Sequence, residues 1–509
     1  MLKRRLMAAA IAVAFAPLPA LAASKDDIAQ LRAEMRRMKA EYESRIGALE
    51  QRLQQAEAKA ATPSSVAASP APVPSAAPGT QAVAQSTPAA PAAPATTVAP
   101  AASSSTAAAI LAASAMPAQP AAMPASAAGA NAFNPAISAI LGGTYANLSR
   151  DPKQYRLQGF MPGGEDIGPG SRSFSLGESE VALSANIDPT FSGQLIFALA
   201  GDNSVSVEEA FVQTKGLANG LNLKAGRMLA GVGYLNSIHA HAWDFVDAPL
   251  AYQAFFGGQY RNDGLQLKWL APTERYLELG FEAGNGGAFP GNDRNKNGFG
   301  SAALYAHIGD DIGESASWRA GISFLHTGAK DRAYTDVDSS GAAVSNSFSG
   351  HANLVIVDGV YKWSPNGNAT QTNFKLQGEY FRRRESGTLA FDTTGNGQTG
   401  AYASAQSGWY LQGVYQFMPA WRAGLRYDRL SSGTPDIGLV SSGALSAADF
   451  SQLSAYNPKR LSFMVDWSPS EFSRIRLQLA QDKSRPGTND NEVFLQYIMS
   501  LGVHGAHTF

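Results

Sequence analysis

The chain has 509 residues, and its 40 lysines and arginines nearly balance 41 aspartates and glutamates, giving a formal net charge of −1. This balance provides no electrostatic surface for a nucleic acid, so we expect no nucleic-acid partner. Cysteine is absent, which excludes a disulfide framework, a thiolate metal site and a cysteine nucleophile.

Residues 1–22 have the pattern of a secretory signal peptide. The basic start MLKRRL is followed by a short apolar run from Met7 to Leu18, and Ala20-Leu21-Ala22 suits signal peptidase. A membrane anchor is the alternative, but a helix that spans a bilayer needs about 20 apolar residues, and this run is shorter. We therefore predict export, with cleavage near Ala22.

Residues 23–60 are predicted to form a coiled coil. From Ile28 to Ala56 apolar residues recur at alternating steps of three and four, with charged residues between them. This is a heptad pattern, and a stretch of about 35 residues is long for an unpartnered helix in water. A lone amphipathic helix is the alternative, but the pattern favours self-association.

Residues 61–132 consist almost entirely of Ala, Pro, Ser, Thr and Val, with hardly any charge. A segment of this composition cannot bury a core, and we predict a disordered linker.

Residues 133–509 contain segments of about ten residues in which apolar and polar side chains alternate. Alternation with period two predicts strands with one apolar face. Counting these segments gives sixteen strands, an even number, as a closed antiparallel membrane barrel requires. The predicted fold class is therefore all-β: a transmembrane antiparallel β-barrel of about 16 strands, preceded by a coiled-coil helix and a disordered linker.

Seven short turns alternate with longer polar stretches along this region. Four of the short turns place an aromatic residue close to a proline, at Pro272, Pro365, Pro419 and Pro469. Proline ends a strand because it lacks the N–H that the ladder needs, and aromatic residues suit the water edge of an apolar belt. We expect all short turns on one rim. We assign to outer loops the polar stretch between the strands 318–327 and 352–364 and the one between the strands 370–382 and 407–418.

Three successive strands, 421–430, 459–467 and 473–482, show the alternation most clearly. Their apolar positions alternate with positions that carry a basic ladder: Arg422, Arg426, Arg460, Arg474 and Arg476. A soluble sandwich would also alternate, with its apolar face inside. The aromatic residues at the turns and the secretory signal favour a membrane barrel, in which these arginines line the lumen.

The last strand, within NEVFLQYIMSLGVHGAHTF, leads to a terminal aromatic residue, Phe509. With the signal, the sixteen strands and the alternating short turns and long loops, this ending resembles Gram-negative outer-membrane porins over residues 133–509. The resemblance implies that Phe509 is presented to the outer-membrane assembly machinery, that the barrel lies in outer-membrane lipid and that the N-terminal region is periplasmic. A coiled coil ahead of a barrel is similar to the layout of sucrose-type porins, and we expect a homotrimer joined through it.

The porin resemblance also implies that the third outer loop, from about Leu229 to Asp263, folds into the lumen as the constriction. The centre of this loop supplies the residues Trp243, Asp244, Phe245, Asp247 and Tyr252. The two aspartates are then expected to face the basic ladder across a water-filled narrowing and to create a transverse field. The alternative is that the aromatic residues pack against the barrel wall while the aspartates cap turns.

His239 and His241, with Asp244, form a possible metal cluster, because imidazole and carboxylate groups suit zinc. A third ligand at a defined spacing is lacking, so the motif is weak. Further lumen candidates are charged residues beside apolar neighbours: Glu178, Glu180, Lys224, Lys268, Glu278, Glu282, Lys375 and Glu379. Both signs occur, so strong ion selectivity is not predicted, and we expect no cofactor.

The chain has no phosphate-binding glycine loop, GxSxG motif or HExxH motif, and we expect no enzyme. The predicted function is a water-filled channel for passive diffusion of small polar solutes. Two alternatives stay open: a substrate-specific uptake protein for sugars, which would stack on the aromatic residues of the loop, or one for a metal or siderophore. A TonB-dependent receptor would need a plug domain and about 22 strands, and the pattern supplies neither.

Deletion of residues 26–60 tests the predicted trimer. The shortened protein should migrate as a smaller species on a non-denaturing gel, because the helix that joins the subunits is gone. An unchanged oligomer size would assign the association to the barrel alone.

Overall fold

The computed structural model describes residues 135–163, 167–177, 179–201, 203–292, 297–395 and 397–502. The predicted signal peptide, coiled coil and linker lie outside the described residues, as do Glu178 and Phe509.

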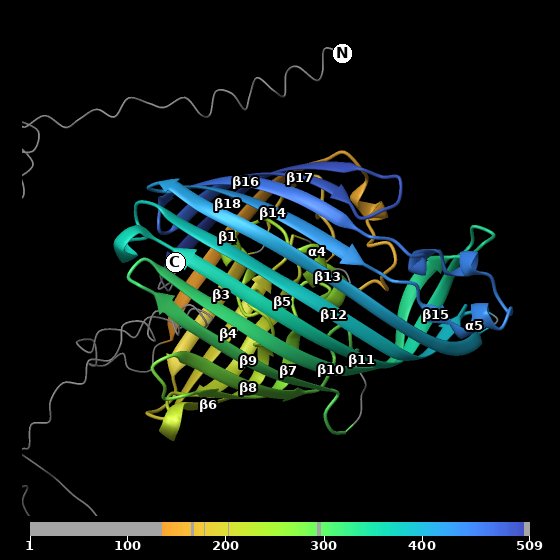
Figure 1. Ribbon diagram of the computed structural model, residues 1–509, viewed down its shortest axis with the longest axis horizontal. Coiled ribbons are helices and arrows are strands. Elements are labelled where there is room, and N and C mark those ends of the chain that lie inside the picture. Colours follow the sequence, from red (N-terminus) through yellow and green to blue (C-terminus); the bar gives the residue numbers. More distant parts are fainter. Residues whose placement is uncertain are drawn as a thin grey trace, which may run out of the picture. The chain divides into compact units, whose positions relative to one another are not determined.

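Eighteen strands in the described part of the chain form one closed antiparallel sheet (Figure 1). Two of them, β2 (Ser173–Ser175) and β15 (Asp436–Ile437), are short additions, so the wall has sixteen strands. β1 (Ala136–Leu148) closes the ring by pairing with β18 (Asp490–Gly502), from Ser138 opposite Gly502 to Leu148 opposite Glu492. The predicted barrel of about 16 strands is confirmed.

The other wall strands are β3 (Ser179–Asn186), β4 (Phe191–Leu199), β5 (Val205–Thr214), β6 (Leu221–Leu229), β7 (Arg261–Leu270), β8 (Tyr276–Gly284), β9 (Ser301–Ile312), β10 (Ala316–Val337), β11 (Ala343–Trp363), β12 (Asn373–Phe391), β13 (Gln398–Met418), β14 (Trp421–Ser431), β16 (Lys459–Ser470) and β17 (Ser473–Lys483). The helices are short: α4 (Leu250–Phe256), α5 (Gly438–Ser441), and the 3₁₀ turns η2 (Pro152–Gln154), η3 (Ala218–Gly220), η4 (Ala240–Ala242), η5 (Pro365–Gly367) and η6 (Ala447–Leu453). None of the helices in the described ranges is both long enough and apolar enough to cross a bilayer.

The seven predicted short turns all lie at the rim where β1 begins and β18 ends, which we call the short-turn rim. They join β3 to β4, β5 to β6, β7 to β8, β9 to β10, β11 to β12, β13 to β14, and β16 to β17. The opposite rim, the loop rim, carries the long connections that follow β1, β6, β8 and β14, but the connections that follow β4, β10, β12 and β17 are short, so the expected alternation of short turns and long loops holds only in part. Trp421 and Trp467 stack at the short-turn rim with ring centroids 5.9 Å apart, as expected for aromatic residues at the edge of an apolar belt.

The outer face of the wall is apolar and the inner face is polar. On β14, β16 and β17 the side chains of Leu425, Phe463 and Leu477 are 53%, 44% and 45% exposed, whereas Arg426 and Arg460 are buried inside. An apolar outer surface around a charged interior is the opposite of the arrangement in a soluble sandwich, whose apolar faces lie inside. The predicted orientation of these strands is confirmed.

Four strands are longer than the sequence indicated. β10 to β13 continue past the expected loop boundaries, so polar stretches assigned to outer loops are strands instead. The inward residues of this extension, including Tyr334, Phe348 and Tyr402, are buried with Phe450 of η6 in one apolar cluster. Its outward residues are mostly small or polar, which hid the strand pattern from the sequence.

A charge on the outer face should destabilise the barrel. Leu477→Arg, in the middle of the outward apolar row of β17, is expected to reduce the free energy of unfolding by about 2–4 kcal/mol in bilayers, because lipid cannot solvate the guanidinium. Glu471→Arg, in the exposed turn before β17, is the matched control and should change it little. Equal effects of the two substitutions in urea titrations would contradict a lipid-facing wall.

Candidate functional site: loop 3 and the inner wall

Residues 230–260, between β6 and β7, form loop 3, which folds into the barrel. Asn236 closes its base: Nδ2 donates to the carbonyl oxygens of Ala230 (2.7 Å) and Tyr260 (3.0 Å), and Oδ1 accepts from the Tyr260 amide (2.8 Å). These bonds gather the two ends of the loop at the point where it leaves the wall.

Loop 3 crosses the whole interior. His239 contacts Glu209 on β5 at 3.1 Å, and Asp244 accepts a 3.0 Å hydrogen bond from Gln412 on β13. In the ring of sixteen wall strands, β5 and β13 are eight places apart, on opposite sides. Loop 3 is therefore anchored to opposite sides of the barrel wall rather than packed against one side.

Glu379 on β12 organises the first part of the loop. Its carboxylate accepts from the amides of Tyr234 and Leu235 at 3.1 and 3.0 Å and from the Tyr252 hydroxyl at 3.0 Å. Gly233 precedes them with φ +71°, and a side chain there would collide with the same carboxylate. One buried acid thus joins the entry of loop 3 to helix α4.

The two aspartates of loop 3 form buried ion pairs with the inner wall. Asp244 lies 2.6 Å from Lys375 Nζ and 3.2 Å from Arg422 Nη1. Asp247 lies 2.8 Å from Arg426 Nη2 and 2.6 Å from Arg460 Nη1. The sequence predicts that the aspartates and arginines face one another across water, but in the structure they are in direct contact.

The rest of the basic ladder binds the backbone of the loop. Arg474 donates to the carbonyl oxygen of His241, and Arg476 donates to that of Trp243 at 2.5 Å. Arg460 donates in the same way to Ala248 at 2.6 Å. The five arginines therefore hold residues 241–248 along β14, β16 and β17, although only three of them pair with an aspartate of the loop.

Burial and pairing act in opposite directions on these aspartates. Burial raises the pKa of Asp247, but Arg460 and Arg426 outweigh it and lower that pKa to about 2. Burial likewise raises the pKa of Asp244, and Lys375 and Arg422 reverse the effect and hold it well below its usual value. Both carboxylates thus stay ionised at neutral pH.

The aromatic residues of loop 3 are buried against the wall and against one another. Trp243, Phe245 and Tyr252 are 7%, 0% and 0% exposed. The guanidinium of Arg426 lies over the Phe245 ring at 4.6 Å, and Tyr252 meets Phe381 edge-on at 5.2 Å. This is the wall-packing alternative for the aromatics, and it leaves these rings no free face on which a sugar could stack.

His239 lies on the opposite wall among three buried carboxylates. Its Nδ1 is 3.5 Å from Glu180 and 3.4 Å from Glu208, and its Nε2 is 3.1 Å from Glu209. His241 Nδ1 is 2.8 Å from the other oxygen of Glu180. Burial lowers the pKa of His239, but these glutamates outweigh it and hold that pKa well above its usual value.

A β-bulge brings two consecutive glutamates into this cluster. Glu209 is opposite Ile196 and Val207 is opposite Phe197, so Glu208 has no partner in the register of β4 and β5. Both glutamates are buried inside the barrel, at 4% and 2% exposure. Strict alternation would turn one of them to lipid, so the sequence analysis missed both, although two adjacent acids in a membrane strand are a sign of a bulge.

The predicted metal residues are therefore brought together only in part. His239 and His241 share Glu180, whereas Asp244 pairs with Lys375 and Arg422 on the other wall.

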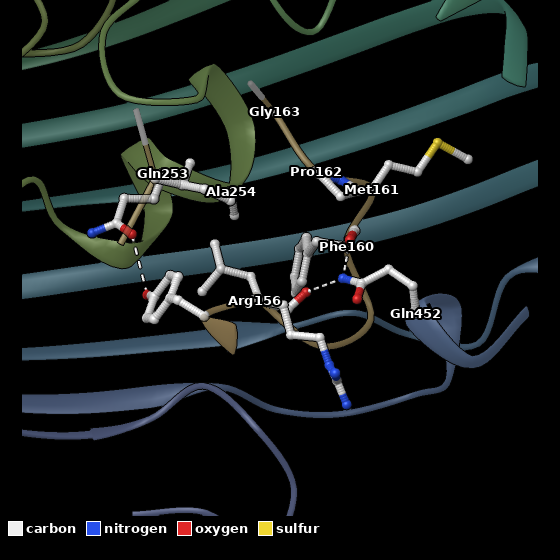
Figure 2. A pocket seen from close by; sticks show the side chains of 11 residues that line it. Arg156, Phe160, Met161, Pro162, Gly163, Gln253, Ala254 and Gln452 are labelled. Atoms are coloured by element: carbon white, nitrogen blue, oxygen red, sulfur yellow. Dashed lines mark hydrogen bonds between the residues drawn. The ribbon is translucent and has the colours of Figure 1, made fainter. Parts of the chain in front are cut away.

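A small cavity lies between loop 3 and the first long connection, residues 149–172 (Figure 2). Gln452 of η6 donates from Nε2 to the carbonyl oxygen of Phe160 at 2.8 Å (Figure 2) and to that of Leu157 at 2.9 Å, both in this connection. Tyr155 donates to Gln253 of α4 at 3.2 Å. The cavity volume of about 60 Å³ is well below the roughly 300 Å³ of the smallest ligand pockets, so the cavity is a packing gap over α4 rather than a solute site.

Basic side chains line the interior toward the short-turn rim. Lys268, Lys375 and Arg422 keep 18%, 19% and 19% of their side-chain surface exposed, more than the fully buried arginines deeper in the ladder. Their acidic partners, Glu278, Asp244 and Asp466, are buried. In these ion pairs the basic partner therefore reaches water more than the acidic partner does.

Comparison with known proteins gives distant likenesses. No family model matches the chain. An uncharacterised protein of Aquifex aeolicus (strain VF5) is 28% identical over 410 residues, which cover 74% of this chain and 80% of the relative.

Among solved structures, the chain is similar to the outer membrane protein OmpT of Vibrio cholerae, in a loop L8 deletion mutant (TM-score 0.44, 12% identity, 72% of this chain and 99% of that one). It is also similar to OprB of Pseudomonas putida (0.43, 13%, 72% and 94%) and to the outer membrane channel DcaP of Acinetobacter baumannii (0.41, 11%, 72% and 96%). At such values the function has to be argued from the residues themselves.

Removal of one loop charge tests the ladder. Asp247→Asn removes one of the two buried carboxylates that Arg426 and Arg460 contact, the other being Asp428, and should reduce the free energy of unfolding by about 3 kcal/mol. Asp263→Asn is the matched control, because its pair with Arg227 is 43% exposed on both sides and should contribute less than about 1 kcal/mol. Indistinguishable denaturant titrations for the two variants would contradict the anchoring role.

Proposed function

We propose that the protein is a porin-type channel of the outer membrane, and that loop 3 is the constriction through which small polar solutes diffuse. The observation that carries this proposal is a loop suspended across a charged barrel interior by side-chain ion pairs and hydrogen bonds. A wall that served only as an anchor would have no need of inward charges, which are costly to bury without partners.

The orientation follows from the same proposal. The short-turn rim faces the periplasm and the loop rim faces outward, as the alternation of turn lengths in outer-membrane barrels requires. The N-terminal region is then periplasmic, with association into a trimer through residues 23–60.

The three partly exposed basic side chains toward the short-turn rim, Lys268, Lys375 and Arg422, bear on which solutes pass. Exposed lysine and arginine side chains attract anions and repel cations within about a Debye length, so small anions should enter this half more readily. Lys375 and Arg422 would act as the selectivity residues, with Asp244 limiting the net charge between them. The sugar alternative loses its support because the aromatic rings of loop 3 are buried.

Single-channel recording in planar bilayers tests the function. The wild-type protein should give stepwise current, and Asp247→Asn should raise the conductance or the open fraction because one end of loop 3 is released. Asp263→Asn, on an exposed pair outside the loop anchors, should leave the current unchanged. If correctly inserted wild-type and Asp247→Asn proteins are both silent, the channel proposal is wrong.

A further inference from the structure

The cluster around His239 has unsatisfied polar atoms at its centre. Neither Nδ1 of His239 nor Oε2 of Glu208 has a hydrogen-bond partner among the described residues, and both are buried. Their separation is 3.4 Å, and Glu180 Oε2 is 3.5 Å from the same nitrogen. These distances are long for charge-assisted hydrogen bonds, which prefer about 2.7–2.9 Å.

The same distances suit the ligands of a metal ion. Zinc binds imidazole nitrogen and carboxylate oxygen at about 2.0–2.2 Å, so two ligands of a tetrahedral zinc stand about 3.4 Å apart. One atom each from His239, Glu180 and Glu208 lies within 4.8 Å of the others. The spacing within the loop lacked a further ligand, and the structure supplies two from other elements: Glu180 on β3 and Glu208 on β5.

The surrounding hydrogen bonds fix these groups as a metal site requires. Glu209 is a carboxylate and can only accept, so Nε2 of His239 donates to it at 3.1 Å, and a cation bound at Nδ1 would displace the second proton of the ring. The other oxygen of Glu209 accepts from the Leu229 amide at 2.9 Å. A ligating histidine whose second nitrogen donates to a carboxylate is the usual outer arrangement of zinc sites.

The geometry points to a binding site for one zinc-class divalent cation, formed by Nδ1 of His239 and the carboxylates of Glu180 and Glu208. Water would complete the coordination. The cation would balance negative charge where three glutamates are buried together, and it would tie loop 3 to β3 and β5, opposite the basic ladder.

The bulge in β5 supports this assignment. Without it, Glu208 would point to lipid, so the extra residue serves to add a carboxylate beside one that already holds His239. A simple histidine–carboxylate pair needs only Glu209.

Zinc binding to the full-length protein tests the site. The protein is extracted in detergent, stripped with a chelator and dialysed against Zn²⁺. We expect about one tightly held zinc per chain in the wild type, with at least a tenfold weaker affinity in Glu208→Gln and in His239→Gln. Ca²⁺, which prefers six to eight oxygen ligands, should not compete.

His351→Gln is the matched control, because it removes a histidine on the exposed face of β11, away from the cluster, and should keep the zinc. The heat-dependent gel mobility of each variant reports whether the barrel is folded. Absence of stoichiometric zinc in the wild type, or its full retention in folded Glu208→Gln and His239→Gln, would overturn the site. A protein that binds zinc but carries no current would overturn the channel and leave this site in place.

Discussion

The contact between the two loop-3 aspartates and the inner-wall cations is the constraint on which the interior depends. Asp247 meets Arg426 and Arg460, and Asp244 meets Lys375 and Arg422, all inside the barrel. Charges removed from water need partners, and the two aspartates of loop 3 find theirs on the wall, whose arginines also pair with Asp428 and Asp466 of neighbouring strands. The apolar exterior needs no such matching, because contacts between lipid chains and apolar side chains are not directional. The positions of the charged residues on the inner face of the wall thus determine the path of loop 3.

The suspension of loop 3 has two ends of different chemistry. At β14, β16 and β17 arginines hold carboxylates and backbone carbonyls, whereas at β3 and β5 glutamates hold imidazoles. Loop 3 therefore carries two aspartates to a basic part of the wall and the basic imidazoles of His239 and His241 to an acidic part. Because the charges of the loop and the wall are complementary at both ends but of opposite sign, they set the direction in which loop 3 crosses the barrel. A loop that crossed in the reverse direction would place aspartates against glutamates and histidines against arginines.

The sequence predicted the wall well and the interior poorly, for physical reasons. Strands such as β14 and β17 were predictable because lipid outside and charge inside impose alternation, which put Leu425 and Arg426 on their correct faces. Beyond the apolar belt both faces of a strand can be polar, so the extensions of β10 to β13 resembled loops. Glu208 was missed because a bulge breaks the alternation on which the prediction rests. The partners of His239 come from β3 and β5, and no local spacing within the loop could reveal them.

The four long strands make the two sides of the loop rim unequal. β10 to β13 have 19 to 22 residues, whereas β3 has 8 and β1 and β18 have 13 (Figure 1). Ten extra residues add about 34 Å of strand at about 3.4 Å per residue. The loop rim is consequently tall on the side of β10 to β13 and low on the side of β3, so in the proposed orientation a bulky molecule or an antibody would approach the loop rim from its low side.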